Sequence, residues 1–197
     1  MSTPAPSEMA AAITPVIAIL DQLGVPYLVG GSVASGVHGE ARGTRDVDIV
    51  ADLRLEHVKS FLEALGDDFY ADEDAIRMAI GERSSFNLIH IPAMLKVDIF
   101  ILKQTPYSQM QISRRIPQVL TIAGDTQAHV ATAEDTVLSK LDWYRLGGEI
   151  SDRQWNDILG VLKTQRERLD RAYLEQWARE IGVADLLERA LSDADLA

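Results

Sequence analysis

The sequence predicts an α+β fold, in which a mixed β-sheet with flanking helices is followed by a C-terminal helical region. Short β-type runs alternate with helical stretches up to residue 130, and from Ala133 onward the apolar residues follow helical spacing alone. A chain of 197 residues is long enough for one buried core with an appended helical part. We therefore expect an α/β core over residues 1–130 and a helical region over 131–197 that packs on it.

The first half of the core is expected to run helix, strand, short helix, strand. Apolar residues at helical spacing predict a helix over 8–23, which a glycine and a proline then stop. The run 26–30 is short and apolar, like a buried strand, and a short helix is expected to begin at Ser32. Residues 46–51, with the sequence DVDIVA, alternate acids with aliphatic residues and predict a second strand.

Further helices are expected in the core over 54–65 and 72–80. Two β-type runs, 85–91 and 95–102, are joined in the manner of a hairpin, and we expect both to pair with the strand at 46–51.

The rest of the chain changes from irregular to helical. The stretch 105–130 predicts one or two short strands, around 117–123 and 126–130. Glycines and a polar run then separate four expected helices, over 133–146, 151–164, 170–181 and 183–192. These helices carry Trp143, Trp155 and Trp177, which are expected to pack in the core.

Composition limits the classes of function. Acids outnumber bases 30 to 19, for a net charge of −11, so binding to bulk nucleic acid or to an anionic membrane is disfavoured. The absence of cysteine excludes disulfides, thiolate metal sites and cysteine nucleophiles. No apolar run approaches the roughly 20 residues of a membrane span, and the amino terminus lacks a basic segment before its apolar stretch. A cytoplasmic protein of bacterial type is the expectation.

Three aspartates stand in apolar strand sequences. Asp46 and Asp48 alternate along one strand, so both side chains project from the same face. Asp98 lies between Val97 and Ile99, where an unpaired acid should be rare. If strand 95–102 lies beside strand 46–51, the three acids converge. Neighbouring carboxylates need a counterion, and oxygen ligands suit a hard cation such as Mg²⁺.

A carboxylate cluster of this kind serves phosphoryl or nucleotidyl transfer, because bound divalent ions orient a phosphoryl oxygen and stabilise the attacking and leaving oxygens. The alternative is that the acids form the solvated face of an edge strand.

Gly30, Gly31 and Ser32 lie between an expected strand and a short helix. Glycine lets the backbone approach a ligand closely, and Ser32 with the helix amino terminus can donate to a phosphate. The spacing matches neither the dinucleotide-binding fingerprint nor the P-loop, and a tight turn that needs small residues for packing remains an alternative. Two cations, Arg42 and Lys140, could counter phosphate charge, although Lys140 could equally be solvated or paired with an acid.

Taken together, Gly30-Gly31-Ser32, Asp46-Val47-Asp48-Ile49 and Val97-Asp98-Ile99 resemble the nucleotidyltransferase superfamily related to DNA polymerase β. The approach to the strand, from Arg42 through Thr44 to Asp46, is similar to the Arg-x-Thr-x-Asp-x-Asp form of small bacterial members. These include aminoglycoside and lincosamide nucleotidyltransferases, minimal nucleotidyltransferases and AbiEii-type toxins. The helical part is also similar to AbiEii-like proteins, through Ala133-Glu134-Asp135, Lys140-Leu141, Arg153 and Asp157-Ile158.

The resemblance implies a nucleotidyltransferase-like sheet and a Mg²⁺-dependent transfer of an NMP group from an NTP to a hydroxyl acceptor, with release of pyrophosphate. The acceptor would be a small molecule, a protein or an RNA end. By the same resemblance Asp46, Asp48 and Asp98 are catalytic and hold one or two Mg²⁺ ions, for which Mn²⁺ can substitute, and Asp98 helps to deprotonate the acceptor. The nucleotide would be bound by Gly30, Gly31, Ser32, Arg42 and Lys140.

Two other hypotheses stay open. An Asp-x-Asp sugar transferase explains Asp46 and Asp48 but leaves the glycine turn and Asp98 unexplained. A non-catalytic protein of nucleotidyltransferase fold, acting as a partner in a toxin–antitoxin type of system, retains all of these residues without turnover. The sequence does not indicate the acceptor, the preferred NTP, or whether the chain pairs with another protein or forms a homodimer.

Overall fold

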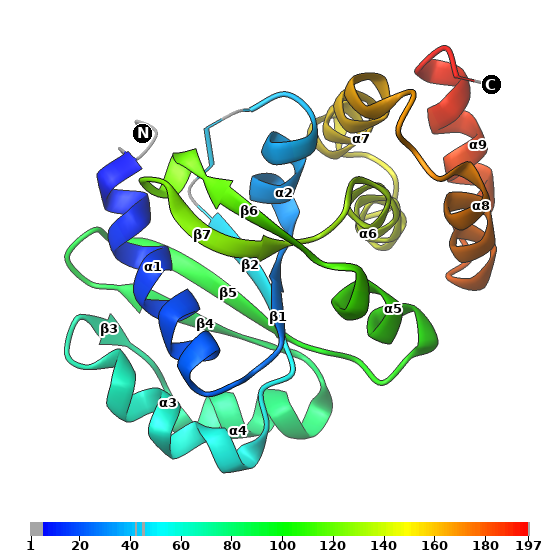
Figure 1. Cartoon of the computed structure of the whole chain (residues 1–197). Coiled ribbons are helices and arrows are strands. Elements are labelled where there is room, and N and C mark those ends of the chain that lie inside the picture. Colours follow the sequence, from blue (N-terminus) through cyan, green and yellow to red (C-terminus); the bar gives the residue numbers. More distant parts are fainter. Residues whose placement is uncertain (1–5, 42, 45, 197) are drawn as a thin grey trace. The chain divides into compact units, whose positions relative to one another are not determined.

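The computed structural model describes residues 6–41, 43–44 and 46–196 (Figure 1). The contacts divide the chain into two compact units. The first contains the described residues of 1–30 and 43–130, and the second those of 31–42 and 131–197. Segment 31–42 thus groups with the helical residues, whereas the boundary proposed from the sequence assigns it to the core.

The first unit is built on a seven-stranded mixed sheet with the strand order β3-β4-β5-β2-β1-β7-β6. Two pairs are parallel, β2 with β5 and β1 with β7, and the other pairs are antiparallel. The strands are β1 (Tyr27–Val29), β2 (Asp46–Ala51), β3 (Phe69–Tyr70), β4 (Ser85–His90), β5 (Leu95–Ile101), β6 (Ile116–Leu120) and β7 (Thr126–Val130). Together with the helices this confirms the α+β class predicted from the sequence.

The helices described in the first unit are α1 (Pro6–Gln22), α3 (Val58–Leu65), α4 (Glu73–Glu82) and α5 (Pro106–Arg114), with short 3₁₀ turns at Leu55–His57 and Thr121–Ala123. Helices α1 and α4 pack against strands of the sheet. Helix α1 crosses over β4 and β5 and buries Ile13, Val16 and Leu20 completely (Figure 1). In β2 and β5 every second residue is buried, beginning with Val47 and Leu95 respectively. The opposite face of these two strands is therefore free to carry polar side chains.

The second unit consists of α2 (Gly31–His38), α6 (Ala133–Leu146), α7 (Asp152–Gln165), α8 (Arg171–Glu180) and α9 (Ala184–Asp193). Side-chain caps begin three of these helices, because Thr132, Ser151 and Asp170 each accept a hydrogen bond from a backbone amide in the first turn. Helix α2 packs against α6 and α7. The four helices expected after residue 131 are present within one or two residues of their predicted bounds.

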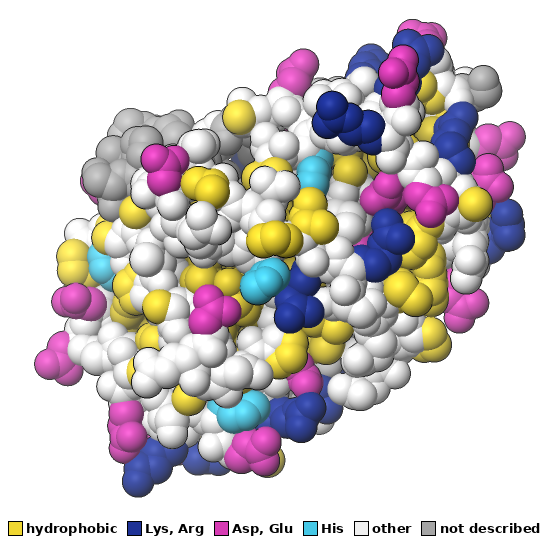
Figure 2. Space-filling view, viewed as in Figure 1, with side chains coloured by type: hydrophobic (Ala, Val, Ile, Leu, Met, Phe, Trp, Pro, Cys, Tyr) yellow, Lys and Arg dark blue, Asp and Glu magenta, His cyan; other side chains and the backbone are white. Residues whose placement is uncertain are grey.

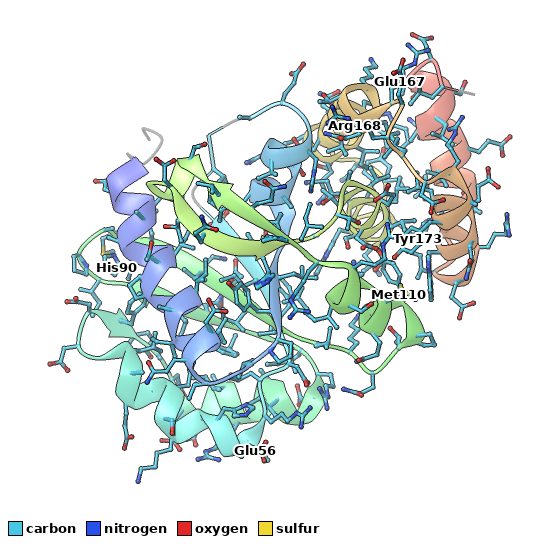
Figure 3. All side chains as sticks on the ribbon, in the orientation of Figure 1. Glu56, His90, Met110, Glu167, Arg168 and Tyr173 are labelled. Atoms are coloured by element: carbon cyan, nitrogen blue, oxygen red, sulfur yellow. The ribbon has the colours of Figure 1, made fainter. Side chains whose placement is uncertain are left out.

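A buried polar network joins α6 to α8. The Asp135 side chain is fully buried and accepts hydrogen bonds from the Thr132 hydroxyl at 2.9 Å and the Tyr173 hydroxyl at 2.7 Å. Tyr173 lies on α8 and is labelled in Figure 3. Glu134 accepts one from the backbone amide of Asp170 at 3.0 Å. The acids at the start of α6 therefore stabilise the helical unit itself.

Several expectations need correction. Strand β4 does not pair with β2, because β5 lies between them. Helix α5 falls in a stretch for which only strands were predicted, although Thr105 caps it and Pro106 occupies its first turn. Trp143 was expected in the core and is 51% exposed, whereas Trp155 and Trp177 are buried. Among the helices described, none is long and apolar enough to cross a membrane.

Candidate active site

The three aspartates of interest lie on two neighbouring strands of the first unit. Strands β2 and β5 run parallel, with Asp48 paired to Asp98 and Asp46 paired to Lys96. Adjacent strands are about 4.8 Å apart, and alternate residues along one strand are separated by about 6.6 Å. The carboxylates thus occupy three corners of a small rectangle on the face of these strands that is not buried.

Burial differs among the three acids. Asp46 is exposed and Asp48 is half-buried, while the Asp98 side chain is only 14% exposed. The hydroxyl of Thr44 donates to the backbone oxygen of Asp46 at 3.0 Å, which fixes the chain as it enters β2. Strand β5 therefore lies beside β2, as the convergence of the acids requires, and Asp48 and Asp98 are both less accessible than Asp46.

Asp98 is contacted by two residues that the sequence analysis did not single out. The Lys96 ammonium lies 2.8 Å from Asp98 Oδ2, and the Asn87 side-chain amide donates to Oδ1 at 2.6 Å. Asn87 on β4 is the register partner of Asp98 across the antiparallel pair. The i, i+2 spacing of Lys96 and Asp98 on one strand was the signal that could have identified the lysine.

The charge of Lys96 is stabilised by all three acids. Its hydrogen bond to Asp98 is the main cause that raises the pKa of Lys96, and partial burial opposes this shift. The negative charges of Asp98, Asp46 and Asp48 raise the pKa further. Lys96 is therefore a resident counterion of the carboxylate group.

The donor set fits a hard divalent cation in its chemistry, since it supplies carboxylate oxygens from one face of adjacent strands. In the arrangement adopted by the described residues, no three His, Cys, Asp or Glu side chains converge on a common ion position. The Asp98 oxygens are directed to Lys96 and Asn87 instead. An ion bound by Asp98 in this arrangement would lie beside the Lys96 ammonium and the Asn87 amide.

The glycine turn follows β1. The Gly30 amide donates to the backbone oxygen of Asp48 at 2.8 Å, which brings the end of β1 beside the acid strand. A Cβ at Gly30 would meet nothing closer than 3.9 Å, so packing does not require glycine there. Gly31 has a φ of 53°, which favours glycine. Gly31 and Ser32 open α2, one residue earlier than expected.

Of the two cations that were expected to bind phosphate, the structure describes Lys140 and not Arg42. Arg42 lies outside the described residues. Lys140, on α6 of the second unit, is 8% exposed and its ammonium lies 2.8 Å from Asp157 Oδ2 on α7. This ion pair favours the alternative of a structurally paired lysine, and a role for Lys140 in binding nucleotide stays a prediction.

Charges are mixed over the face of the molecule seen in Figure 2, where acidic and basic side chains are interspersed. In that view the Lys and Arg side chains of the described residues do not gather into one broad patch.

Comparison with known proteins identifies the fold through structure alone. No protein-family model matches the sequence, and no curated protein sequence is significantly similar to it. The chain is similar in structure to an antigenic nucleotidyltransferase-like protein from Paracoccidioides brasiliensis, with a TM-score of 0.61, 17% identity and coverage of 97% of this chain and 94% of that one. It is also similar to the antibiotic-resistance factor ANT(2'')-Ia, with a TM-score of 0.52, 12% identity and coverage of 94% and 93%.

These similarities extend over nearly the whole of each chain, so the protein has a nucleotidyltransferase-like fold. The superfamily resemblance inferred from the glycine turn and the aspartates is thereby confirmed at the level of fold. The finer resemblance to AbiEii-type proteins stays a prediction.

Proposed function

We propose that this protein is a Mg²⁺-dependent nucleotidyltransferase that moves an NMP group from an NTP to a hydroxyl acceptor. The observation that carries the proposal is the register of β2 and β5, which sets Asp48 directly beside Asp98 with Asp46 on the same face. Three acids on one patch of a sheet are electrostatically costly, and the contact of Lys96 with Asp98 offsets part of that cost. Because the fold is nucleotidyltransferase-like, metal binding for nucleotidyl transfer is a functional reason for placing three acids together.

The proposed reaction is a single displacement. The acceptor hydroxyl oxygen attacks the α-phosphorus, the bond from that phosphorus to the bridging oxygen breaks, and pyrophosphate leaves. Asp98, whose side chain is 14% exposed, helps to take the acceptor proton. Asp46, Asp48 and Asp98 would hold Mg²⁺, or Mn²⁺ in its place, and the bound ion supplies charge stabilisation for the phosphoryl and leaving oxygens.

Nucleotide binding is assigned to Gly30, Gly31 and Ser32, with Arg42 and Lys140 as further candidates. Support for Gly30 comes from its surroundings, where an added Cβ would make only ordinary van der Waals contacts, the nearest at 3.9 Å: because packing does not demand glycine there, close approach of a ligand is the better reason. Its bond to the Asp48 carbonyl ties that position to the acid strand. Backbone donors next to paired carboxylates suit a triphosphate that carries a divalent ion.

The acceptor is proposed to be a small molecule or a protein hydroxyl. The strong acidity of the chain disfavours a long nucleic acid, whose phosphates would be repelled. An RNA end stays within the proposal, because a single terminus presents few phosphates.

The experiment is to incubate the protein with each of the four NTPs, labelled at the α-phosphate, together with Mg²⁺ and pools of candidate acceptors. Label should appear on an acceptor with equimolar release of pyrophosphate, and Asp46→Asn should abolish both. Asp67→Asn is the matched control, because Asp67 is exposed and lies away from β2 and β5.

Other outcomes would favour the competing hypotheses. Turnover of a nucleotide sugar without pyrophosphate would favour the sugar transferase. A failure of calorimetry to detect binding of any NTP in the presence of Mg²⁺ would favour the non-catalytic partner protein.

A further inference from the structure

Lys96 has an unusual position for a lysine on this sheet. It is the register partner of Asp46 and lies two residues before Asp98 on the same strand, so it completes the rectangle formed with the three acids. Its ammonium contacts Asp98 at 2.8 Å, and its side chain is 46% exposed. The ammonium can therefore leave the acids for solvent or a ligand without disturbing the apolar face of β5.

The Asp98 carboxylate is fully engaged by protein donors, with Oδ2 on Lys96 and Oδ1 on Asn87. A divalent ion that takes Asp98 as a ligand needs at least one of these oxygens. An ammonium and a divalent cation at the same oxygen repel each other strongly. The neutral Asn87 amide adds no such repulsion, so Lys96 is the group that an ion must displace.

A displaced Lys96 needs a new anionic partner. The long flexible stem of lysine allows its ammonium to move by several ångströms, and an incoming triphosphate supplies phosphate oxygens next to the site. Metal and nucleotide binding then favour each other. The nucleotide gives the displaced ammonium a new anionic partner, and the ion releases the ammonium that binds the phosphates. By thermodynamic reciprocity the effect on metal affinity equals the effect on nucleotide affinity.

We propose that Lys96 is an internal cation that competes with the divalent ion for Asp98 and moves to the triphosphate when the nucleotide binds. This inference rests on the proposed function and adds a coupling residue to it. Lys96 then keeps the acids neutralised in the free protein and makes stable metal binding depend on the nucleotide.

The test is a titration with Mn²⁺, followed by the electron paramagnetic resonance signal of the free ion, with and without a non-hydrolysable NTP analogue. Without nucleotide, Lys96→Met should bind Mn²⁺ at least about fivefold more tightly than the wild type, the lower end of typical coupling between sites. The analogue should then raise Mn²⁺ affinity by a smaller factor in Lys96→Met than in the wild type. Lys59→Met is the matched control, because Lys59 is an exposed lysine of α3 that pairs with Glu63 and not with the three aspartates in the described contacts, and it should behave as the wild type.

Lys96→Gln keeps most of the stem and a donor without the charge, and it replaces Lys96→Met if the latter does not fold. Thermal unfolding gives a second readout, in which Mn²⁺ should raise the Tm of the charge-free variant more than that of the wild type. Equal Mn²⁺ affinities and equal Tm shifts for the variant and the wild type would overturn the role of Lys96 and leave the proposed function intact. If Asp48→Asn does not weaken Mn²⁺ binding in the presence of the analogue, the proposed metal centre itself fails, and the Lys96 inference with it.

Discussion

Asp48→Asn is expected to lower kcat for nucleotidyl transfer by at least about 10²–10³-fold, the loss typical when one electrostatic partner of a transition state is removed. Asp48 on β2 is the register partner of Asp98 on β5, so its carboxylate is one of the three that are proposed to hold the ion. The asparagine has nearly the same shape, which limits the change to charge. The measurement is initial-rate kinetics of α-phosphate label transfer.

Asp48→Asn should affect the free energy of unfolding much less than it affects kcat. Like charges opposite each other on paired strands are destabilising by roughly 0.2–1 kcal/mol, so Asp48→Asn should leave the free energy of unfolding unchanged or slightly higher. Asp67→Asn should alter neither quantity, because Asp67 is exposed in the loop before β3. A variant that is fully active, or one whose lost activity is explained by unfolding, would refute the catalytic role of Asp48.

Lys140→Met is expected to destabilise the helical unit by about 3–5 kcal/mol, because it removes the cation that contacts the buried Asp157 carboxylate. The two side chains are only 10% and 8% exposed, and their charged atoms lie 2.8 Å apart. Asp157→Leu should cost a similar amount, while the double variant should recover most of the loss because no uncompensated charge remains. Chemical denaturation measures all three.

Lys163→Met provides the comparison for this prediction. Lys163 is an exposed lysine of the neighbouring helix α7, so its loss should change the free energy of unfolding by less than about 0.5 kcal/mol. If Lys140→Met kept full stability and instead lost affinity for NTP, Lys140 would be a nucleotide ligand, as the superfamily resemblance implies.

Much of the site could be predicted from local patterns. The alternation of Asp46 and Asp48 with buried Val47 and Ile49 fixes which face the acids occupy. A pairing of strand 95–102 with strand 46–51 was expected, but single-sequence patterns do not determine which residues of two strands become partners. The observed register of β2 and β5 sets Asp48 beside Asp98, as the convergence of the acids requires.

Lys96 and Asn87 were missed for related reasons. Lysine on a polar strand face usually faces solvent, and its significance here depends on Asp46 lying opposite on another strand. Asn87 reaches Asp98 only through the register of the β4–β5 hairpin. The Asn87–Asp98 contact and the pairing of Lys96 with Asp46 both cross between strands, and no short window of sequence contains them.

The fold shows the same limit. Helix α5 carried local signals in Thr105 and Pro106 that would have predicted it. No local signal predicted that residues 31–42 group with the helical unit. This grouping depends on the packing of α2 against α6 and α7, which are distant in the chain. Trp143 is a similar case, since its periodic position on α6 was typical of a core residue and yet it is 51% exposed.

The most direct measurement is the anomalous scattering of Mn²⁺ in crystals of the wild-type protein grown with a non-hydrolysable NTP analogue. A peak bounded by carboxylate oxygens of Asp46, Asp48 and Asp98, with the analogue's phosphates on its open side and the Lys96 ammonium withdrawn from Asp98, is the expected result. A nucleotide bound elsewhere, or a metal peak that none of the three aspartates touches, would contradict the assignment of this sheet face as the catalytic centre.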